Sequence, residues 1–450
     1  MVKPQVFADE ERERIFERVA AVDVAKATGM VCTRAPDPSR PGKRINTVWP
    51  MTASVPAIAA LGKKLAQAGI QMVTLESTSD YWRIWYYVLE QAGLAVQLVN
   101  ASQAKNLPGR PKTDKLDAIW LARLTEMGLL RASFVPPAAI RALREYTRLR
   151  TRLVQERTRC WQRLEKLLEG ALIKLSSVAS KLTTLSAQDM VRALIAGERD
   201  PQVLAALARG KMKAKHDDLV EALDGMFGEH HGELAQLLLD QIAFLDGKIA
   251  GLTTRIAQAA AAVPAAWGVN ADGTTGPDAG TAPADPVLPV VQRLAQVPGI
   301  SEDLARSIIA ETGLDMSRFP DAAHLVSWAG LCPRARQSGA RARNGKKGQG
   351  NGYLRGYLGQ AAIGAAGTAT FLGERYHRIA RRRGKAKAQV AVGRSILVII
   401  WHLLASPEAR FTDPGAGYYQ ARTDKDRRIK NHIRQIEALL GHPITIAKAA

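Results

Sequence analysis

The sequence predicts an α/β N-terminal domain, a long α-helical coiled-coil middle and a mainly α-helical C-terminal domain. Three observations support this fold class. Short β-type runs alternate with helical runs between residues 19 and 100, as in sheets that carry crossover helices. Apolar residues then recur at helical and heptad spacings between residues 140 and 256. Residues 264–289, rich in Ala, Gly, Pro, Thr and Asp, are typical of a flexible linker ahead of the last domain.

The N-terminal elements follow from the hydrophobic pattern. A compact apolar run at Val19–Val24 predicts a strand, and two short segments after it are its expected hairpin partners. The predicted strands are Val19–Val24, Gly29–Thr33, Thr47–Trp49, Met72–Leu75 and Leu94–Val99, and the predicted helices are Ala57–Ala68, Tyr81–Ala92 and Thr113–Met127. Their alternation indicates a mixed sheet that binds ligands at the ends of its strands.

Two long helices dominate the predicted middle of the chain. Residues Ile140–Leu172 have a helical pattern with one charged side, which gives a helix about 50 Å long. A second helix carries an a/d seam of apolar residues: Leu238, Ile242, Leu245, Ile249, Leu252 and Ile256. Such a seam either packs in a helical hairpin within one chain or pairs two chains, and the sequence leaves both open. Between the two helices, Leu182–Met226 indicates several short helices.

The predicted domains are the α/β domain at 12–135, the helical coiled-coil domain at 136–262, a flexible linker at 263–290, the C-terminal domain at 291–412 and a tail at 413–450. The polar tail is expected to hold one helix around Ile429–Leu440. Within the C-terminal domain, Val297–Ile300 (VPGI) and the apolar helix after it have the form of a helix-hairpin-helix. Backbone N–H groups at such a turn can hold a DNA phosphate, and an ordinary packing turn has the same sequence pattern.

Charge indicates the kind of partner. The 450 residues include 63 Lys and Arg against 42 Asp and Glu, a formal charge of +21. An excess this large favours a polyanion, nucleic acid above an anionic membrane surface. The three cysteines form no CxxC pair, which argues against a zinc site or a disulfide framework and fits a reducing cytoplasm. The charged N-terminus does not look like a signal peptide, and the apolar window Ile396–Leu404 is too short to cross a bilayer.

Four acids form a candidate metal site. Asp23 lies inside the first predicted strand, where a bare carboxylate would be costly to bury, and Glu76 ends a second strand. Asp114 and Asp117 are three residues apart and share one face of a helix. Together the four could hold hard divalent cations that act on a phosphodiester. Each also has a structural explanation, since an Asp-x-x-Asp pair is often a solvated helix face. Asp80 is better explained as the N-cap of the helix that follows it.

The basic segment Leu331–Tyr357 is the second candidate site. Its cations, which no acid balances, are Arg334, Arg336, Arg341, Arg343, Lys346, Lys347 and Arg355. This one-sided charge favours contact with phosphate. Ser338 lies near the start of the segment, and no neighbouring His or Asp suggests a hydrolase triad. On residues alone, Ser338 is either a turn serine or a nucleophile that the arginines and a metal from elsewhere in the chain would activate.

Two sets of motifs resemble the DEDD-type insertion-sequence transposases. VDVAK at Val22–Lys26, LESTSDYW at Leu75–Trp82 and KTDKLDAIWLA at Lys112–Ala122 are similar to their N-terminal half. VPGI, WAGLCPRARQSG at Trp328–Gly339 and GNGYLRGYLGQAA at Gly350–Ala362 are similar to their C-terminal half. Ser79 stands where the family more often has Gly, and the 264–289 linker is longer than usual. The likeness spans roughly residues 18–128 and 291–365.

The resemblance implies an RNase H-like (RuvC-like) N-terminal fold in which Asp23, Glu76, Asp114 and Asp117 hold Mg²⁺. It implies that Ser338 attacks DNA to form a covalent phosphoserine. It also implies a structured non-coding guide RNA that pairs with donor and target double-stranded DNA, a division of labour known from other guided systems. A homo-oligomer, dimer or tetramer, would form through the coiled coil.

The sequence therefore predicts a DNA transposase or recombinase that cuts and rejoins strands. We expect it in a bacterial-type cytoplasm, associated with the nucleoid and not with a membrane. Two alternatives remain. The first is a metal-dependent RNase H-like nuclease or junction resolvase that hydrolyses with water. The second is a non-catalytic nucleic-acid-binding scaffold whose acids are structural.

Overall fold

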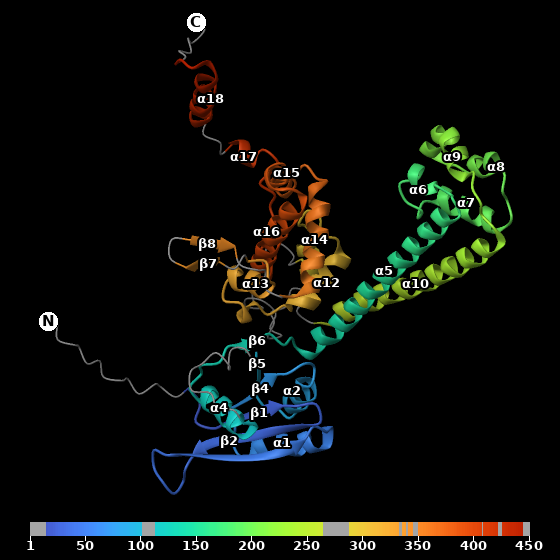
Figure 1. Ribbon diagram of the computed structural model, residues 1–450. Helices are drawn as coiled ribbons and strands as arrows, with labels where there is room; N and C mark the ends of the chain where they lie inside the picture. Colours follow the sequence, from blue (N-terminus) through green and yellow to red (C-terminus); the bar gives the residue numbers. More distant parts are fainter. Residues whose placement is uncertain are drawn as a thin grey trace. The chain divides into compact units, whose positions relative to one another are not determined.

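The computed structural model describes residues 15–100, 113–263, 288–332, 335–338, 341–344, 350–406, 408–421 and 425–443. The chain divides into two compact units, Met1–Val135 and Pro136–Ala450. Strands and helices alternate in the first unit, and the second is largely helical (Figure 1). The finer division of the second unit into domains stays a prediction.

A six-stranded mixed sheet forms the centre of the first unit. Its strands are β1 (Val19–Val24), β2 (Thr28–Pro36), β3 (Arg44–Thr52), β4 (Met72–Ser77), β5 (Val96–Asn100) and β6 (Ala132–Ser133). They lie in the order β3-β2-β1-β4-β5-β6. β1, β2 and β3 pair antiparallel, whereas β1, β4 and β5 pair parallel. The predicted mixed sheet is confirmed, with the predicted hairpin strands longer than expected.

Helices cover both faces of this sheet. They are α1 (Val55–Gln67), α2 (Trp82–Gln91) and α4 (Asp114–Glu126). Successive strand residues point to opposite faces, so Ala20 and Val22 pack in one cluster with α1 and α2. Val19 and Ala21 pack in the other cluster, with α4. Cys32 lies in the α4 cluster, and burial raises the pKa of its thiol to about 12, so it remains a protonated apolar side chain.

The predicted N-cap role of Asp80 is wrong. The N-cap of α2 is Tyr81, and no side chain makes a capping hydrogen bond there. The Asp80 carboxylate instead pairs with Arg83, three residues later, at 2.9 Å. Both side chains are exposed, so the pair contributes little to stability.

The second unit begins with two long helices. They are α5 (Ala138–Gly170) and α10 (Glu229–Ala261), which pack side by side (Figure 1). Four seam residues of α10 are buried: Ile242, Leu245, Ile249 and Ile256. Ile242 and Leu245 share a cluster with Cys160 of α5. Within one chain, therefore, the heptad seam packs in a helical hairpin, the first of the two alternatives.

Short helices close the far end of this hairpin around their own core. They are α6 (Leu175–Val178), α7 (Leu185–Ile195), α8 (Pro201–Ala206), the 3₁₀ helix Gly210–Lys215 and α9 (His216–Leu223). Leu175, Met190 and Leu204 are among their fully buried residues. The predicted short helices are confirmed. They bury apolar surface at the end of the α5–α10 hairpin.

The rest of the second unit contains helices and one small hairpin. The helices are α11 (Val290–Ala295), α12 (Glu302–Thr312), the 3₁₀ helix Met316–Arg318, α13 (Ala322–Trp328), α14 (Gly352–Ala366), α15 (Phe371–Arg383), α16 (Lys385–Ala405), α17 (Tyr418–Ala421) and α18 (Lys425–Leu440). The hairpin strands are β7 (Ala335–Ser338) and β8 (Arg341–Asn344). The predicted tail helix corresponds to α18, which begins four residues earlier than expected.

Helix α16 is longer than the apolar window Ile396–Leu404 that the sequence indicates. It has 21 residues, and an 18-residue window within it has a mean hydropathy of 1.6, so it is long and apolar enough to cross a membrane by length and composition alone. The window expected from the sequence was shorter because it left out the Ala and Val residues before Arg394. However, Val392, Ile396 and Ile400 are fully buried and α16 packs on α13, α14 and α15. A core helix of a globular unit has the same character.

Ser79 has strained backbone geometry. In the part of the chain that the structure describes, Ser79 (φ 48°) and Leu172 (φ 61°) are the non-glycine residues with positive φ. Such a conformation costs an L-residue about 1–2 kcal/mol. Ser79 lies three residues after Glu76, so this turn has a conformational cost that a glycine would not have.

We therefore expect Ser79→Gly to raise the free energy of unfolding by about 0.5–1 kcal/mol, because relief of strain outweighs the added entropy of the unfolded chain. The measurement is the midpoint of urea unfolding. Ser54→Gly is the matched control, since Ser54 has φ −122° and no side-chain capping bond. A shift of the same sign and size in both variants would contradict the strain argument.

Candidate functional site

Two of the four predicted acids occupy equivalent positions on adjacent strands. The parallel register pairs Val22 of β1 with Leu75 of β4, and Asp23 and Glu76 are the next residue on each strand. Residues at equivalent positions on neighbouring strands point to the same face. Glu76 is buried, with 6% of its surface exposed. The two carboxylates thus lie side by side near the C-terminal ends of β1 and β4.

Helix α4 covers the same face of the sheet. Thr125 of α4 donates a hydrogen bond to Thr74, at 2.7 Å, two residues before Glu76 on that face. Val99 and Met30, the register partners of Glu76 and Asp23, pack in the same cluster as Ala118. Asp23 and Glu76 therefore point to the side of the sheet on which α4 lies.

The C-terminal end of α4 is fixed by a buried ion pair. Glu126, 1% exposed, accepts a hydrogen bond from Arg34 at 2.7 Å and also pairs with Arg44. Arg34 is the register partner of Val19, at the start of β1. Helix α4 therefore runs against the direction of β1. Its first turn, which contains Asp114 and Asp117, lies toward the strand ends that carry Asp23 and Glu76.

These carboxylates have the chemistry of a site for a hard cation, because Mg²⁺ prefers oxygen ligands. Asp23, Glu76 and Asp117 supply only carboxylate oxygens, and Asp117 is partly exposed. Helix α4 begins at Asp114, directly after the N-cap Thr113, and the buried Ala118 lies one turn later. Among the described residues, no three His, Cys, Asp or Glu side chains are close enough to hold a metal ion. The fold thus places Asp23 and Glu76 on the face that α4 covers, with the backbone of Asp114 and Asp117 in the first turn of that helix.

Part of the basic segment forms a hairpin, which the sequence does not predict. Strands β7 and β8 pair antiparallel, with Arg336 opposite Arg343 and Ser338 opposite Arg341. Ser338 is the last residue of β7. Arg334, Lys346 and Lys347 lie outside the described residues. The backbone register thus places the predicted nucleophile opposite one arginine and two cross-strand pairs away from a pair of arginines.

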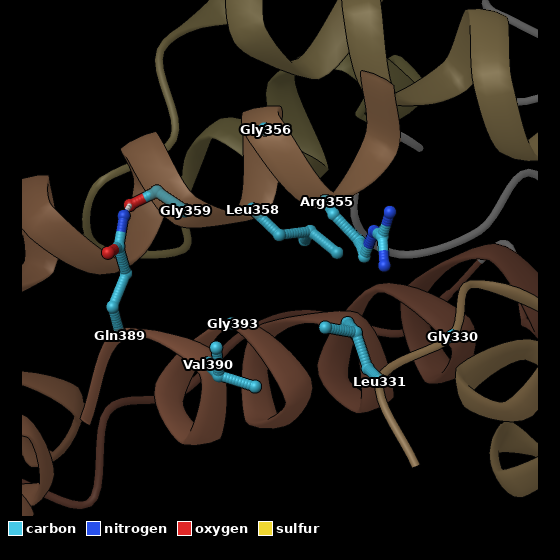
Figure 2. Close-up of a pocket in the computed structure, with 9 residues that line it drawn as sticks. All are labelled: Gly330, Leu331, Arg355, Gly356, Leu358, Gly359, Gln389, Val390 and Gly393. Carbon is cyan, nitrogen blue, oxygen red and sulfur yellow. Dashed lines mark hydrogen bonds between the residues drawn. The ribbon is translucent and has the colours of Figure 1, made fainter. Parts of the chain in front are cut away.

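Arg355, near the end of the basic segment, lies on α14. It lines a pocket of about 300 Å³ between α14 and α16 (Figure 2). Gln389 and Val390 of α16 line the opposite wall. Neither residue is singled out by the sequence. The one signal that could have indicated the pocket is the spacing of Gly356 and Gly359, three apart on one helix face.

A buried carboxylate holds α14 in place. Glu311, at the end of α12, is fully buried and accepts two hydrogen bonds from Arg148 of α5, both at 2.8 Å. It also accepts one from the side-chain amide of Asn351 at 2.6 Å. Asn351 is the N-cap of α14, and its Oδ1 accepts from the Leu354 N–H. Glu311 therefore connects α5, α12 and the start of α14.

Arg148 and its neighbour Arg144 complete this network. Arg144 donates to the backbone carbonyls of Ala310 and Glu311, at 2.8 and 2.7 Å. The hydrogen bonds to Glu311 raise the pKa of Arg148 above its usual value, so the guanidinium stays charged. The Arg148 guanidinium also lies over the ring of Tyr353, 4.7 Å from its centroid. The sequence indicates none of this, since Arg148 and Glu311 are 163 residues apart.

The VPGI turn packs closely against α14. Gly299 has φ +89°, and a Cβ there would lie 2.1 Å from the carbonyl oxygen of Ala361. A Cβ on Gly364 would lie 3.0 Å from the Gly299 Cα. This contact favours the packing interpretation of the turn at Gly299. The helix-hairpin-helix role in DNA binding stays a prediction.

We expect Glu311→Gln to lower the free energy of unfolding by about 3 kcal/mol, because it removes one partner of a buried ion pair and leaves Arg148 uncompensated. The measurement is urea unfolding followed by helical circular dichroism. Glu302→Gln is the control on the same helix: Glu302 is 52% exposed and pairs with Arg306 at 2.7 Å, so its loss should cost less than about 1 kcal/mol. Equal effects of the two substitutions would rule out a special role for the buried network.

Comparison with known proteins identifies two domains. Residues 20–173 match a DEDD-type IS110 transposase domain, described as a transposase. Residues 291–378 match a domain described as a transposase of the IS116/IS110/IS902 family. A search of curated proteins gave no match.

Among solved structures, RuvC of Thermus thermophilus matches at 14% identity with a TM-score of 0.21, over 26% of this chain and 99% of RuvC. The N-terminal mixed sheet and its helices belong to the matched transposase domain, and the RNase H-like (RuvC-like) fold stays a prediction. The chain therefore carries IS110-family transposase domains in both halves, and it is an enzyme that acts on DNA in transposition or recombination.

Proposed function

We propose that this transposase cuts and rejoins DNA through a covalent phosphoserine on Ser338, with Mg²⁺ held by Asp23, Glu76, Asp114 and Asp117. The observation that carries the metal half of the proposal is the register of β1 and β4. It sets Asp23 and Glu76 side by side on the face that α4 covers. A fold without a metal role has little reason to bury Glu76 next to a second carboxylate, because like charges repel.

The acids divide into two kinds by their position. Asp23 and Glu76 sit on strands whose neighbours are fully buried, so they form a fixed base for a cation. Asp114 and Asp117 belong to the first turn of a helix and complete the ligand set. A divalent cation bound there would stabilise charge that develops on a phosphodiester and would help to deprotonate a hydroxyl.

Ser338 supplies the nucleophile in this proposal. Its hydroxyl loses a proton, its oxygen bonds to phosphorus, and the bond from phosphorus to one deoxyribose oxygen breaks, with that oxygen taking a proton. Attack by the hydroxyl of another strand end reverses the step and rejoins the DNA. Arg336, Arg341 and Arg343 would neutralise the phosphate, and their cross-strand register supports this role. Like charges at paired positions destabilise a hairpin unless an anion lies between them.

The choice of sequence belongs to a second part of the proposal. A structured non-coding guide RNA would pair with donor and target double-stranded DNA, while the protein binds backbone and shape. The net charge of +21 supports nucleic acid as the partner. The protein would act in a bacterial-type cytoplasm, at the nucleoid.

Oligomer formation through the helical hairpin is also proposed. The buried seam of α10 is already used by α5. Leu237 and Phe244, a heptad apart on α10, remain 66% and 63% exposed. This second stripe supports a dimer or tetramer in which α10 helices of different protomers meet.

Two alternatives differ in chemistry. A metal-dependent nuclease or junction resolvase would use water and leave Ser338 idle, so it would form no adduct. A non-catalytic scaffold conflicts with the transposase domains at both ends of the chain. The adduct is therefore the decisive observation.

For Ser338→Ala we expect complete loss of strand exchange and of any denaturation-stable protein–DNA adduct, because the attacking oxygen is gone, while DNA binding remains. The measurements are recombination in cells, adduct trapping on denaturing gels and DNA affinity. Ser317→Ala is the control, because Ser317 is an exposed serine of the same unit. This variant should retain recombination, the adduct and DNA affinity. Recombination by Ser338→Ala at the wild-type level would eliminate the serine mechanism.

For Asp117→Asn, and likewise Asp114→Asn, we expect activity to fall on the order of 100-fold or more, because one charge that stabilises the reacting phosphate is lost. The unfolding midpoint should stay unchanged, since Asp117 is partly exposed. Activity as a function of Mg²⁺ concentration and urea unfolding test the two parts. Asp80→Asn is the control in the same unit, and wild-type activity in all three variants would remove the four-acid assignment.

A further inference from the structure

The pocket between α14 and α16 has features that the proposed chemistry does not use. It has a volume of about 300 Å³, at the lower end of the range for small-molecule sites. Leu331, Leu358 and Val390 supply apolar side chains. Arg355 and Leu331 lie at one end, and Gln389 lies at the other (Figure 2).

Glycines make this space possible. A Cβ on Gly359 would lie 2.9 Å from Nε2 of Gln389, and a Cβ on Gly393 would lie 3.3 Å from the carbonyl oxygen of Leu358. The two helices are therefore in close contact at these positions. At Gly356 the situation differs, because a Cβ there would meet nothing within 4 Å. Gly356 thus opens the pocket, whereas Gly359 and Gly393 set the distance between its walls.

The ends of the pocket are polar and the middle is apolar. The side-chain amide of Gln389 donates to the carbonyl oxygen of Gly359 at 3.1 Å, which fixes the amide at one end of the pocket (Figure 2). The Arg355 guanidinium lies at the opposite end. Apolar side chains on both walls with a cation at one end suit a ring that carries an anionic substituent. An arginine plane can stack on such a ring or pair with its phosphate.

The kind of ligand that the pocket would bind follows from the positive charge around it and from the DNA substrate of the enzyme. Between Leu331 and Arg394 there are 15 Lys and Arg and one acid, Glu374, and Leu331 leads directly into the basic segment. The enzyme acts on DNA. We propose that the α14–α16 pocket receives one unstacked base of the bound DNA, with the phosphate of that nucleotide against Arg355. Enzymes that act on a base take it out of its stack into a pocket between aromatic or apolar side chains, and proteins that bind single strands hold unstacked bases beside a cationic groove.

The proposal rests on DNA as the substrate and is independent of Ser338 and of the four acids. A variant without the serine should therefore still take up the base. This separates failure of the pocket proposal from failure of the phosphoserine mechanism.

The test uses duplexes of the element's end sequence with 2-aminopurine at one position at a time, because this base fluoresces more strongly when it leaves the stack. With the full-length protein we expect the 2-aminopurine fluorescence to rise several-fold at one labelled position. Gly356→Leu and Val390→Phe fill the pocket from its two helices, and each should abolish that rise. Each should also weaken binding about 5- to 30-fold, which corresponds to about 1–2 kcal/mol.

Gly247→Leu is the matched control, since Gly247 is also a helical glycine with nothing within 4 Å of a built Cβ. It should respond to the labelled duplexes as the wild type does. The proposal would be overturned if the wild-type protein raised the fluorescence at none of the labelled positions. It would also be overturned if the rise persisted in both pocket variants. A rise with labelled RNA of the same sequence and none with DNA would also overturn it.

Discussion

The helical unit depends on one buried carboxylate. Glu311 is fully buried and is the common acceptor for side chains from α5 and from the start of α14. A buried charge without partners is strongly unfavourable, so these three helices can be assembled only together. The same interaction fixes Asn351, the residue from which α14 begins. The position of Arg355, and of the pocket wall that it shares with Gly356, follows from that start.

In the α/β unit the comparable constraint is the register of the sheet. A slip of one residue between β1 and β4 would move one of the two acids to the opposite face. The register is held because Val22 and Leu75 belong to one buried cluster while Val19 and Ala21 belong to the other. Glu126, with Arg34 and Arg44, anchors the end of α4 on strands that carry no acid of the site. The candidate metal face is thus positioned by contacts distant from the metal ligands.

The local hydrophobic pattern of the sequence predicts many of the helices and strands. Val19–Val24 and the helices of the α/β unit are predicted within a few residues, because burial on one face gives a clear period in the sequence. The heptad spacing of α10 predicts its seam, while the choice of partner needs the structure. The β7–β8 hairpin is missed because ARQS and RARN have no apolar alternation. Glu311 is missed for a different reason: its partners lie on α5 and α14, and sequence spacing carries no information about such distant contacts.

The arrangement of α5 has a mechanical consequence. The helix is anchored near its start by Arg144 and Arg148 and by hydrogen bonds from Thr151 and Arg152 to tyrosines of α14. From Arg152 it continues to Gly170, about 27 Å at 1.5 Å per residue. A rotation of about 5° about the anchored part would move the far end by roughly 2 Å over that length. Conversely, a force on the short helices α6 to α9 would act on Glu311 and on the first turn of α14.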